Sequence, residues 1–289
     1  MSFVQYRIVL KPLAPLHVGK RKYGNLMEIR EYVPGRTLWG ALTARVTRDY
    51  FGGNPHQYDS VGEFFNENFR FGYLWPSLDG EKPYFPWEHD DFDYLFKFGY
   101  VGQSIDCETK STEEGNLHEV EFIGSRTREG DQVYLIGNLW IRKDKLLENG
   151  QVLVEADSKS KQISLEDVFN TIQLGGEKGY GWGRVKIEKF EKDESDFSIY
   201  NAKVDTSEDE VILEFKKDFY LPFHALATGE LEGKISGPIE PFIGYEFRGA
   251  WSLSLPYICY VPGCKILDNF ESLKLKIDTY GILHLIKNC

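Results

Sequence analysis

The chain has few cysteines and few histidines, and neither type has metal-ligand spacing. Its four cysteines form no C-x-x-C pair, and Cys259 and Cys264 lie five residues apart without a nearby pair of histidines. We therefore expect no zinc site, and a disulfide framework would be unusual in so large a chain. The acidic residues Asp90, Asp91 and Asp93 lack the glycine and the spaced acids of a calcium loop, so we interpret them as a solvated face. The sequence predicts no metal, no cofactor and reduced cysteines.

The chain also lacks a long apolar run. No stretch approaches the roughly 18 apolar residues that span a bilayer, and the first ten residues alternate polar and apolar side chains, unlike a signal peptide. We expect a cytoplasmic protein that does not bind membranes. Its 42% hydrophobic and 15% aromatic content excludes general disorder, and its 289 residues favour two domains.

Positive charge is scarce overall but concentrated near the start. The net charge of −11 argues against nonspecific nucleic-acid binding over the whole surface. Residues 1–50, however, hold nine Lys and Arg against three acids, while acidic residues collect at 79–93, 106–121 and 191–210. One basic face could bind RNA locally. A patchy acidic protein without such a face is the simpler alternative.

The most informative segment is a glycine-rich run, with five glycines among the nine residues 175–183. Glycine permits positive φ and removes the Cβ, so such a loop can bring its N–H groups close to phosphate oxygens. It does not fit a Walker loop, because Tyr180 and Gly181 follow Gly179. Nor does it open a helix, as a dinucleotide fingerprint should, since residues 185–190 alternate as a strand. An anionic, stackable polymer is the predicted ligand, and a plain turn into a strand is the alternative.

Periodicity predicts a mixed α and β chain. Strands are expected at 3–10 and 69–74, a helix at 37–51 with Thr37 as N-cap, a hairpin through 121–136, a helix at 164–174 capped by Ser164, and a strand at 185–190. Residues 88–120 show little periodicity and are interpreted as an insertion or long loop. The order strand, helix, strands, helix, strand is that of a ferredoxin-like α+β domain.

Two domains of this kind are expected. The first covers 1–192, with an insertion around 76–120, and an acidic linker follows within 191–210. The second, 205–289, is smaller and β-rich, with strands near 211–215, 236–239, 251–260 and 274–277. The sequence YVPG recurs at 32–35 and 260–263, which suggests that both domains share a plan.

Three stretches together resemble the RAMP superfamily of CRISPR-associated proteins. They are LAPLHVG at 13–19, YVPGRTLWGAL at 32–42 and the glycine loop through 175–185. Their order and spacing also fit, and they cover about the first two thirds of the chain. YVPGCK at 260–265 looks like the second-domain signature of the type III subunit that caps the foot of the complex, although Arg36 and Cys264 replace the usual serine.

This resemblance implies two ferredoxin-like, RNA-recognition-type domains in a CRISPR RNA-guided effector complex. It further implies a noncatalytic subunit that holds the repeat-derived five-prime tag of the guide RNA. The partners would be the guide RNA, the large polymerase-like subunit and the backbone RAMP subunits. The residues expected to bind RNA are Lys20, Arg21, Lys22, Gly35, Arg36, Arg126, Arg128, Gly175, Gly176, Lys178, Gly179, Tyr180, Gly181, Trp182, Gly183 and Arg184. Phosphates would meet the cations and free N–H groups, and Tyr180 or Trp182 would stack on a base.

Three alternatives stay open. A guide-processing endoribonuclease would need a histidine facing the RNA, and His17 is the candidate, although a structural imidazole is the favoured interpretation. A backbone subunit would polymerise along the guide, but the aspartate expected after the first strand is missing between Leu13 and Tyr32, where Glu28 stands. A β-rich interaction protein without RNA is the third.

Overall fold

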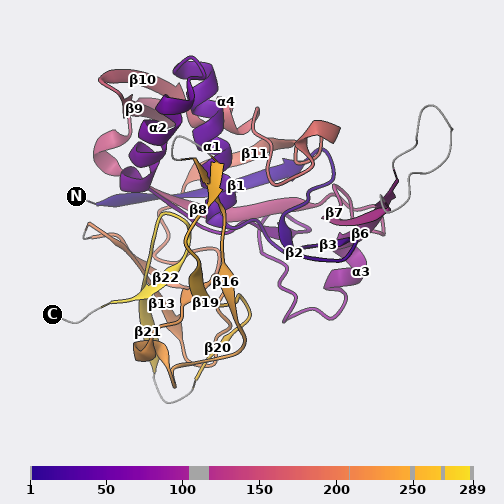
Figure 1. The fold of residues 1–289 in the computed structure, drawn as a ribbon. Coiled ribbons are helices and arrows are strands. Elements are labelled where there is room, and N and C mark those ends of the chain that lie inside the picture. The colour runs from indigo at the N-terminus through magenta and orange to yellow at the C-terminus, as the bar shows by residue number, and fades with distance from the viewer. Residues whose placement is uncertain (1, 104–116, 208, 248–250, 268–270, 287–289) are drawn as a thin grey trace, which may run out of the picture.

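The computed structural model describes residues 2–103, 117–207, 209–247, 251–267 and 271–286. Within them the chain is an α+β protein that is rich in strands, has few helices and forms several sheets (Figure 1). Helices α1 and α2 lie at one end and a small four-stranded sheet projects to one side. The described residues from 203 onward, called the C-terminal half, lie beneath the central sheet. Cys107, Cys289 and residues 104–116 of the expected insertion fall outside the described residues.

The central sheet is antiparallel and has the strand order β11-β1-β8-β4, with β5 also paired to β8. Its strands are β1 (Phe3–Pro12), β4 (Phe69–Phe71), β5 (Trp75–Ser77), β8 (Tyr134–Arg142) and β11 (Val185–Lys192). Side chains alternate between its two faces, so Leu139 and Ile141 pack toward the helices and Trp140 packs toward the C-terminal half. The middle strands are therefore covered on both faces, and the expected strands at 3–10 and 185–190 are confirmed.

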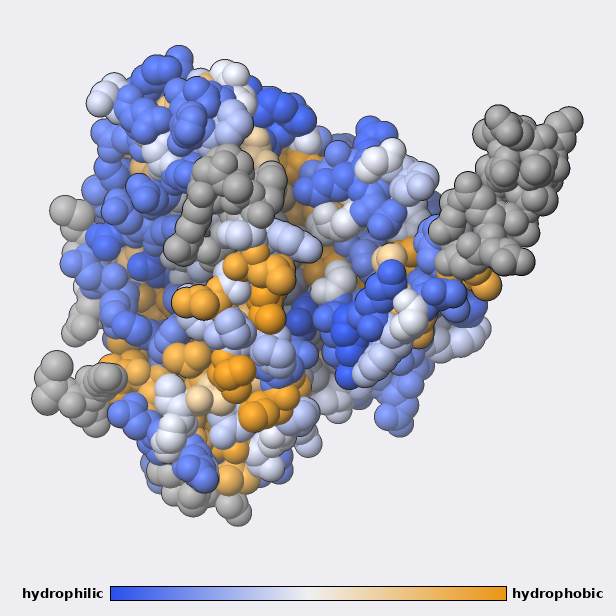
Figure 2. All heavy atoms as spheres, viewed as in Figure 1, coloured by the Kyte–Doolittle hydropathy of each residue, from blue (hydrophilic) through white to orange (hydrophobic). Residues whose placement is uncertain are grey.

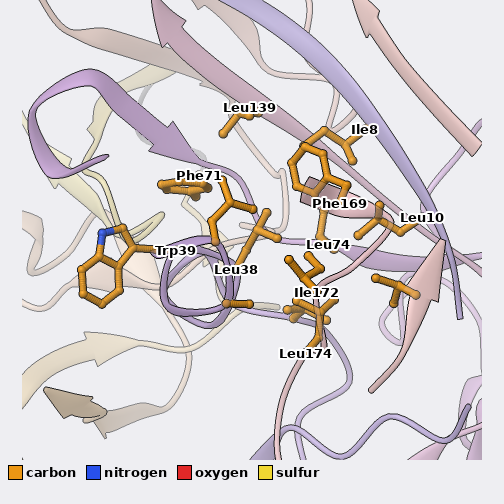
Figure 3. Close-up of a cluster of buried hydrophobic side chains, with 14 of the residues drawn as sticks. Ile8, Leu10, Leu38, Trp39, Phe71, Leu74, Leu139, Phe169, Ile172 and Leu174 are labelled. Atoms are coloured by element: carbon orange, nitrogen blue, oxygen red, sulfur yellow. The ribbon is translucent and has the colours of Figure 1, made fainter. Parts of the chain in front are cut away.

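Three helices pack against the first face. They are α1 (Gly35–Tyr50), α2 (Pro55–Asn68) and α4 (Leu165–Phe169). Leu38 faces Phe71 and Leu74 in the core shared with the sheet (Figure 3). The helix expected at 37–51 is confirmed, but Pro34 occupies its N-cap position in place of Thr37. Ser164 caps α4 by accepting a hydrogen bond from the Asp167 N–H, although this helix is shorter than expected.

Helix α2 was missed by the sequence analysis, despite a clear start signal. Pro55 occupies the first turn, and the Asn54 side chain accepts a hydrogen bond from the His56 N–H. The hairpin of β9 (Gln151–Ala156) and β10 (Lys159–Ser164), also missed, lies beside α2. The described part of the chain also has short 3₁₀ turns at Lys143–Lys145, Glu148–Gly150, Lys178–Tyr180 and Gly229–Leu231.

A separate four-stranded sheet replaces much of the expected loop structure. Its strand order is β2 (Gly19–Tyr23), β3 (Leu26–Ile29), β7 (His118–Ile123) and β6 (Lys97–Gly102). The short helix α3 (Phe92–Phe96) directly precedes β6 in the chain. Of the two interpretations of 88–120, the long loop is wrong for the described residues, because β6 and β7 pair with each other and β7 continues the basic hairpin β2–β3. The insertion stays a prediction. The hairpin expected through 121–136 is only partly confirmed. The Thr127 N–H donates to the Asp131 carbonyl across a turn, but the flanking strands β7 and β8 enter different sheets.

The C-terminal half is built from strands, and its described residues form no α-helix. Its seven-stranded sheet has the order β12 (Lys203–Asp205), β13 (Val211–Lys216), β21 (Ser272–Ile277), β22 (Leu283–Leu285), β14 (Ala225–Leu226), β19 (Tyr257–Tyr260) and β16 (Ile239–Phe242). Two small pairs accompany it, β15 (Ile235–Ser236) with β20 (Lys265–Ile266) and β17 (Tyr245–Phe247) with β18 (Trp251–Leu253). Cys259 and Cys264 are buried here as free thiols.

The two halves share a continuous aromatic core. Tyr32, Tyr73 and Trp75 pack in one cluster with Phe223 from the C-terminal half. Tyr200 lies in the segment between the halves and is fully buried. Its hydroxyl donates a hydrogen bond to the Tyr73 carbonyl, at 2.5 Å, and accepts one from the Asn138 N–H, at 3.1 Å. The connecting segment is thus held firmly at Tyr200.

Candidate nucleic-acid interface

The two ends of the glycine loop are held against the chain's own segment at 13–19. Gly175 and Gly183 have φ of 75° and 76°, which favours glycine. A Cβ on Gly175 would lie 2.1 Å from the His17 carbonyl oxygen. The N–H groups of Gly176 and Gly183 donate to the carbonyls of His17 and Pro15, each at 2.7 Å. These glycines therefore have a structural explanation, and these two N–H groups serve the fold.

The tip of the loop is open. A Cβ on Gly179 or on Gly181 would meet no atom within 4 Å. Tyr180, between them, is 80% exposed. Close approach to a ligand is therefore possible at the tip, where the 3₁₀ turn Lys178–Tyr180 lies.

One side of this loop borders a pocket of about 390 Å³, called here the basic pocket. It joins the first basic strand, the start of α1, the glycine loop and the C-terminal half. Its lining includes Val18, Gly19, Arg30, Pro34, Arg36, Thr37, Gly175, Lys178, Phe242, Ile243, Gly244 and Tyr245. All three stretches singled out from the sequence thus meet at one place. Arg30 and the residues from the C-terminal half were missed, because sequence spacing carries no signal for their approach.

Lys178 is the cation of the basic pocket with the least compensation. Desolvation by burial lowers its pKa below the usual value for lysine. Among the described residues no carboxylate forms an ion pair with it. An anion bound in the pocket would offset this desolvation and favour the charged ammonium.

Arg30 is a cation of the same pocket, but it belongs to a buried network that joins the two halves. Its guanidinium donates to the Tyr32 hydroxyl, at 3.2 Å, and to the Glu240 carboxylate, at 2.5 Å. The same carboxylate oxygen lies 2.8 Å from Nε2 of His224, whose Nδ1 lies 2.6 Å from the Tyr73 hydroxyl. Glu240 therefore neutralises the charge of Arg30. Arg30 links the two halves at this network, called the junction, as well as lining the basic pocket.

This network shifts the titration of its members. Burial lowers the pKa of His224 to about 4, although its hydrogen bond to Glu240 opposes the shift. Burial by itself would raise the pKa of Glu240. The hydrogen bond from His224 and the charge of Arg30 outweigh that effect, and the pKa of Glu240 falls to about 2. Neutral His224 then accepts from Tyr73 and donates to Glu240.

Arg36 and Gly35 both contact the C-terminal half. The Arg36 guanidinium lies 4.9 Å from the centre of the Tyr280 ring, and Gly244 approaches it so closely that a Cβ there would lie 2.3 Å from Arg36 Nε. A Cβ on Gly35 would lie 2.6 Å from the Tyr280 carbonyl oxygen, and 2.3 Å from that of Phe71 in the central sheet. The Tyr-Val-Pro-Gly-Arg segment therefore anchors the second half as well as lining the basic pocket.

The other basic side chains expected to bind RNA are spread over the surface. On β2, Lys20 lies 3.8 Å from Glu31 and Arg21 lies 2.6 Å from Glu28, while Lys22 is exposed. Gly19, at the start of this strand, lines the basic pocket, so β2 leads away from it. These three side chains extend the basic surface beyond the pocket.

Arg126 and Arg128 brace a turn near α3. Arg126 donates to the Gly130 carbonyl at 2.8 Å, and Arg128 donates to the Tyr94 carbonyl at 3.0 Å. Arg128 also lies over the ring of Phe98, at 4.9 Å from its centre. Arg184 lines a different pocket, beside Leu13. These arginines stand apart from the basic pocket.

His17 is 7% exposed, and its ring is fixed by the chain around it. Its Nδ1 lies 2.8 Å from the Glu121 carbonyl oxygen, which is a geometry for donation by the Nδ1–H. Its carbonyl accepts from the Gly176 N–H. His17 thus links the glycine loop to β7, which supports the interpretation of a structural imidazole.

The fold has similar solved structures. A chain in the cryo-EM structure of the Type III-B Cmr-beta bound to cognate target RNA and AMPPnP, state 1, has a TM-score of 0.50 and 17% identity. The match covers 90% of this chain and 85% of that chain. The two chains share a fold.

Two further structures show lower similarity. A chain in the structure of the Type III-B Cmr-beta bound to cognate target RNA has a TM-score of 0.49 and 16% identity, with 90% of this chain and 86% of that chain covered. A CRISPR protein from Archaeoglobus fulgidus has a TM-score of 0.40 and 10% identity, with 95% and 92% covered. No protein-family model and no curated protein sequence matches the chain.

The described residues contain no group of three or more His, Cys, Asp or Glu side chains that could hold a metal ion. Of the acidic trio, Asp93 pairs with Lys97 at 2.8 Å, and Asp91 accepts a hydrogen bond from the Tyr84 hydroxyl at 2.6 Å. None of the helices in the described part of the chain is long and apolar enough to cross a membrane.

Proposed function

We propose that the chain is a noncatalytic, RNA-binding subunit of a type III CRISPR effector complex, and that it holds the repeat-derived five-prime tag of the guide RNA. The carrying observation is the convergence of three distant stretches on one basic pocket. Gly19, Arg36 and Lys178 come from the three stretches that resemble the RAMP superfamily, and all line that pocket. The desolvation that lowers the pKa of Lys178, its lack of an ion pair among the described residues and the nearby start of α1 all favour a phosphate there.

The topology supports a ferredoxin-like first domain, which we place at residues 1–192. Its strand order β11-β1-β8-β4 is antiparallel throughout, with α1 and α2 between β1 and β4 and α4 between β8 and β11. This is the arrangement that two βαβ halves produce when they share one sheet. We assign residues 205–289 to a second, β-rich domain of related plan. The fold shared with the Type III-B Cmr-beta chain is consistent with both assignments.

Contacts with neighbouring subunits are supported by exposed apolar side chains. Figure 2 shows such side chains gathered on the face where β16 and β19 lie. Ile239, Tyr245, Leu253 and Leu255 are between 58% and 87% exposed, which is unusual for four such residues in one region. A backbone or large subunit of the effector complex would cover them.

The test is to sequence RNA that copurifies with the chain when it is expressed with its neighbouring genes and a CRISPR array. We expect guide RNAs that share one five-prime tag. Lys178→Glu should reduce their recovery by roughly tenfold or more, since a charge-assisted bond is lost and repulsion replaces it. Arg36 is not a suitable target, because it lies against Tyr280 and its reversal would disturb the fold.

Lys161→Glu is the matched control, because Lys161 is an exposed lysine on the hairpin β9–β10 and does not line the basic pocket. It makes the same change in charge and should leave RNA recovery unchanged. Equal recovery with Lys178→Glu, or no enriched RNA with the unaltered chain, would refute the proposal and favour an interaction protein without RNA. Nuclease protection confined to the five-prime tag would distinguish tag capping from a backbone role, in which protection would extend along the guide.

A further inference from the structure

A second pocket lies on the other side of the glycine loop, between the loop and the small sheet. Its volume is about 530 Å³, which is ample for a nucleotide. We call it the aromatic pocket, and its lining comprises Pro15, Tyr100, Gly102, Gln103, His118, Val120, Phe122, Glu177, Tyr180 and Trp182. Only Tyr180 and Trp182 of this set were expected to contact RNA from the sequence.

Three aromatic side chains of this pocket are in ring contact with one another, and two of its rings are more than half exposed. The Trp182 ring lies edge-on to Phe122, with centroids 5.1 Å apart, and to Tyr100, at 6.1 Å. Phe98 stacks on Phe122 from a neighbouring strand, at 5.6 Å. Tyr100 and Tyr180 are 55% and 80% exposed. Aromatic rings that are held by such contacts and partly exposed to solvent are suited to stacking on an unpaired nucleobase.

Glu177 is the acidic residue of the aromatic pocket, and its backbone is strained. Its φ of 54° lies in the left-handed region, which Gly175, Gly181 and Gly183 occupy in the same loop with glycine. Its carbonyl accepts hydrogen bonds from the N–H groups of Tyr180 and Trp182, which fixes its place at the start of the 3₁₀ turn. Within the described part of the chain, its carboxylate has no ion pair or hydrogen bond. Glycine would be less strained at this position. The presence of glutamate therefore indicates that its side chain has a role in binding.

Two consecutive residues face the two pockets. Lys178 lines the basic pocket, and Glu177 lines the aromatic pocket. A single strand of RNA that crosses the loop could therefore place a phosphate on the lysine side and its base on the aromatic side. The carboxylate would then meet the edge of the base and not the phosphate, which it would repel.

We propose that the aromatic pocket selects a guanine of the bound RNA, stacked on its rings and hydrogen-bonded through its Watson–Crick edge to Glu177. This inference rests on the proposed RNA-binding function. Guanine alone presents two adjacent donors on that edge, N1–H and the N2 amino group, and these match the two oxygens of a carboxylate. Adenine and cytosine offer one donor beside an acceptor, and uracil offers one donor between two acceptors, so each leaves a carboxylate oxygen unsatisfied or repelled.

The experiment measures binding of single-stranded RNA probes of about eight nucleotides to the full chain by fluorescence anisotropy. One probe is all uridine, and the others carry one guanosine, inosine or adenosine at each position in turn. At one position of the probe, replacing uridine by guanosine should make the probe bind roughly tenfold more tightly. Inosine lacks the N2 amino group and should keep only part of that gain.

Two variants remove the carboxylate in different ways. Glu177→Gln keeps the size of the side chain, and Glu177→Gly relieves the backbone, so loss of folding cannot explain a shared result. Both should abolish the preference for guanosine and keep the affinity for the uridine probe within about twofold. Glu188→Gln, an exposed glutamate on β11 outside the aromatic pocket, is the matched control and should keep the preference.

The outcomes separate this inference from the proposed function. Binding that depends on Lys178 but shows no guanosine preference in any register would overturn the base site and leave the proposed function standing. A preference that survives both Glu177 variants would also overturn it. If no probe binds the unaltered chain, the proposed function fails and the base site fails with it.

Discussion

Acid should weaken the junction between the two halves through a single buried histidine. His224 is fully buried between Glu240 and Tyr73, with Arg30 on the far side of the carboxylate. Its pKa of about 4 in the folded chain lies below the ordinary value of 6.5, because burial penalises the imidazolium. The unfolded chain therefore binds a proton at a higher pH than the folded chain does. Stability from this residue is fully present above pH 6.5 and is lost as the pH falls toward 4.

The magnitude follows from the two pKa values. Lowering the pH from about 8 to about 5 should remove about 2 kcal/mol of the free energy of unfolding through His224, and full titration should remove about 3 kcal/mol. Other groups also titrate in this range, so the informative quantity is the difference between the unaltered chain and His224→Gln. Glutamine offers one donor and one acceptor but does not titrate.

The assay is urea unfolding at several pH values, followed by tryptophan fluorescence, because Trp75 and Trp140 lie in the same core cluster as the junction. The stability advantage of the unaltered chain over His224→Gln should shrink by about 2 kcal/mol between pH 8 and about pH 5. A difference that stays constant over this range, or one that grows in acid, would refute the reasoning. It would show that His224 is not held neutral by burial.

Two stability predictions follow from close contacts. Gly183→Ala should lower the free energy of unfolding by more than about 2 kcal/mol or prevent folding, since its Cβ would lie 1.9 Å from the Leu174 carbonyl oxygen at a positive φ. Gly179→Ala is the control, because its Cβ would meet no atom within 4 Å. It should change the free energy of unfolding by less than about 0.5 kcal/mol. Thermal unfolding of the pair checks this, and equal midpoints would contradict it. Tyr200→Phe should cost about 1–3 kcal/mol in a urea titration, because its hydroxyl bridges the Tyr73 carbonyl and the Asn138 N–H in the core. A Tyr200→Phe chain as stable as the original would mean that these bonds contribute nothing net.

Sequence patterns predicted the elements whose signals are local. Strand β1 is a ten-residue run rich in aromatic and β-branched side chains. Helix α4 begins with a serine cap, and Asp167, three residues later, donates its N–H to that serine. Helix α2 also has local signals, at Asn54 and Pro55, but its buried face includes Gln57, Gly62 and Asn68, which weakens its apolar periodicity. The sheet of β6 and β7 gave weaker signals, because neither strand alternates regularly between buried and exposed residues, and β7 also depends on pairing with β3.

The candidate site divides in the same way. The sequence by itself determined the glycine-rich loop, the charge of Lys178 and the aromatic character of Trp182, because these are properties of residues next to one another. Only the tertiary structure decided that Arg30 and Tyr245 join the basic pocket, and that Tyr100 and Glu177 share the aromatic pocket. These contacts depend on strand pairing and packing between segments that are distant in the sequence. No local sequence pattern specifies the free energy of such pairing. The same is true of His224, since its shifted pKa comes from burial that only the folded chain provides.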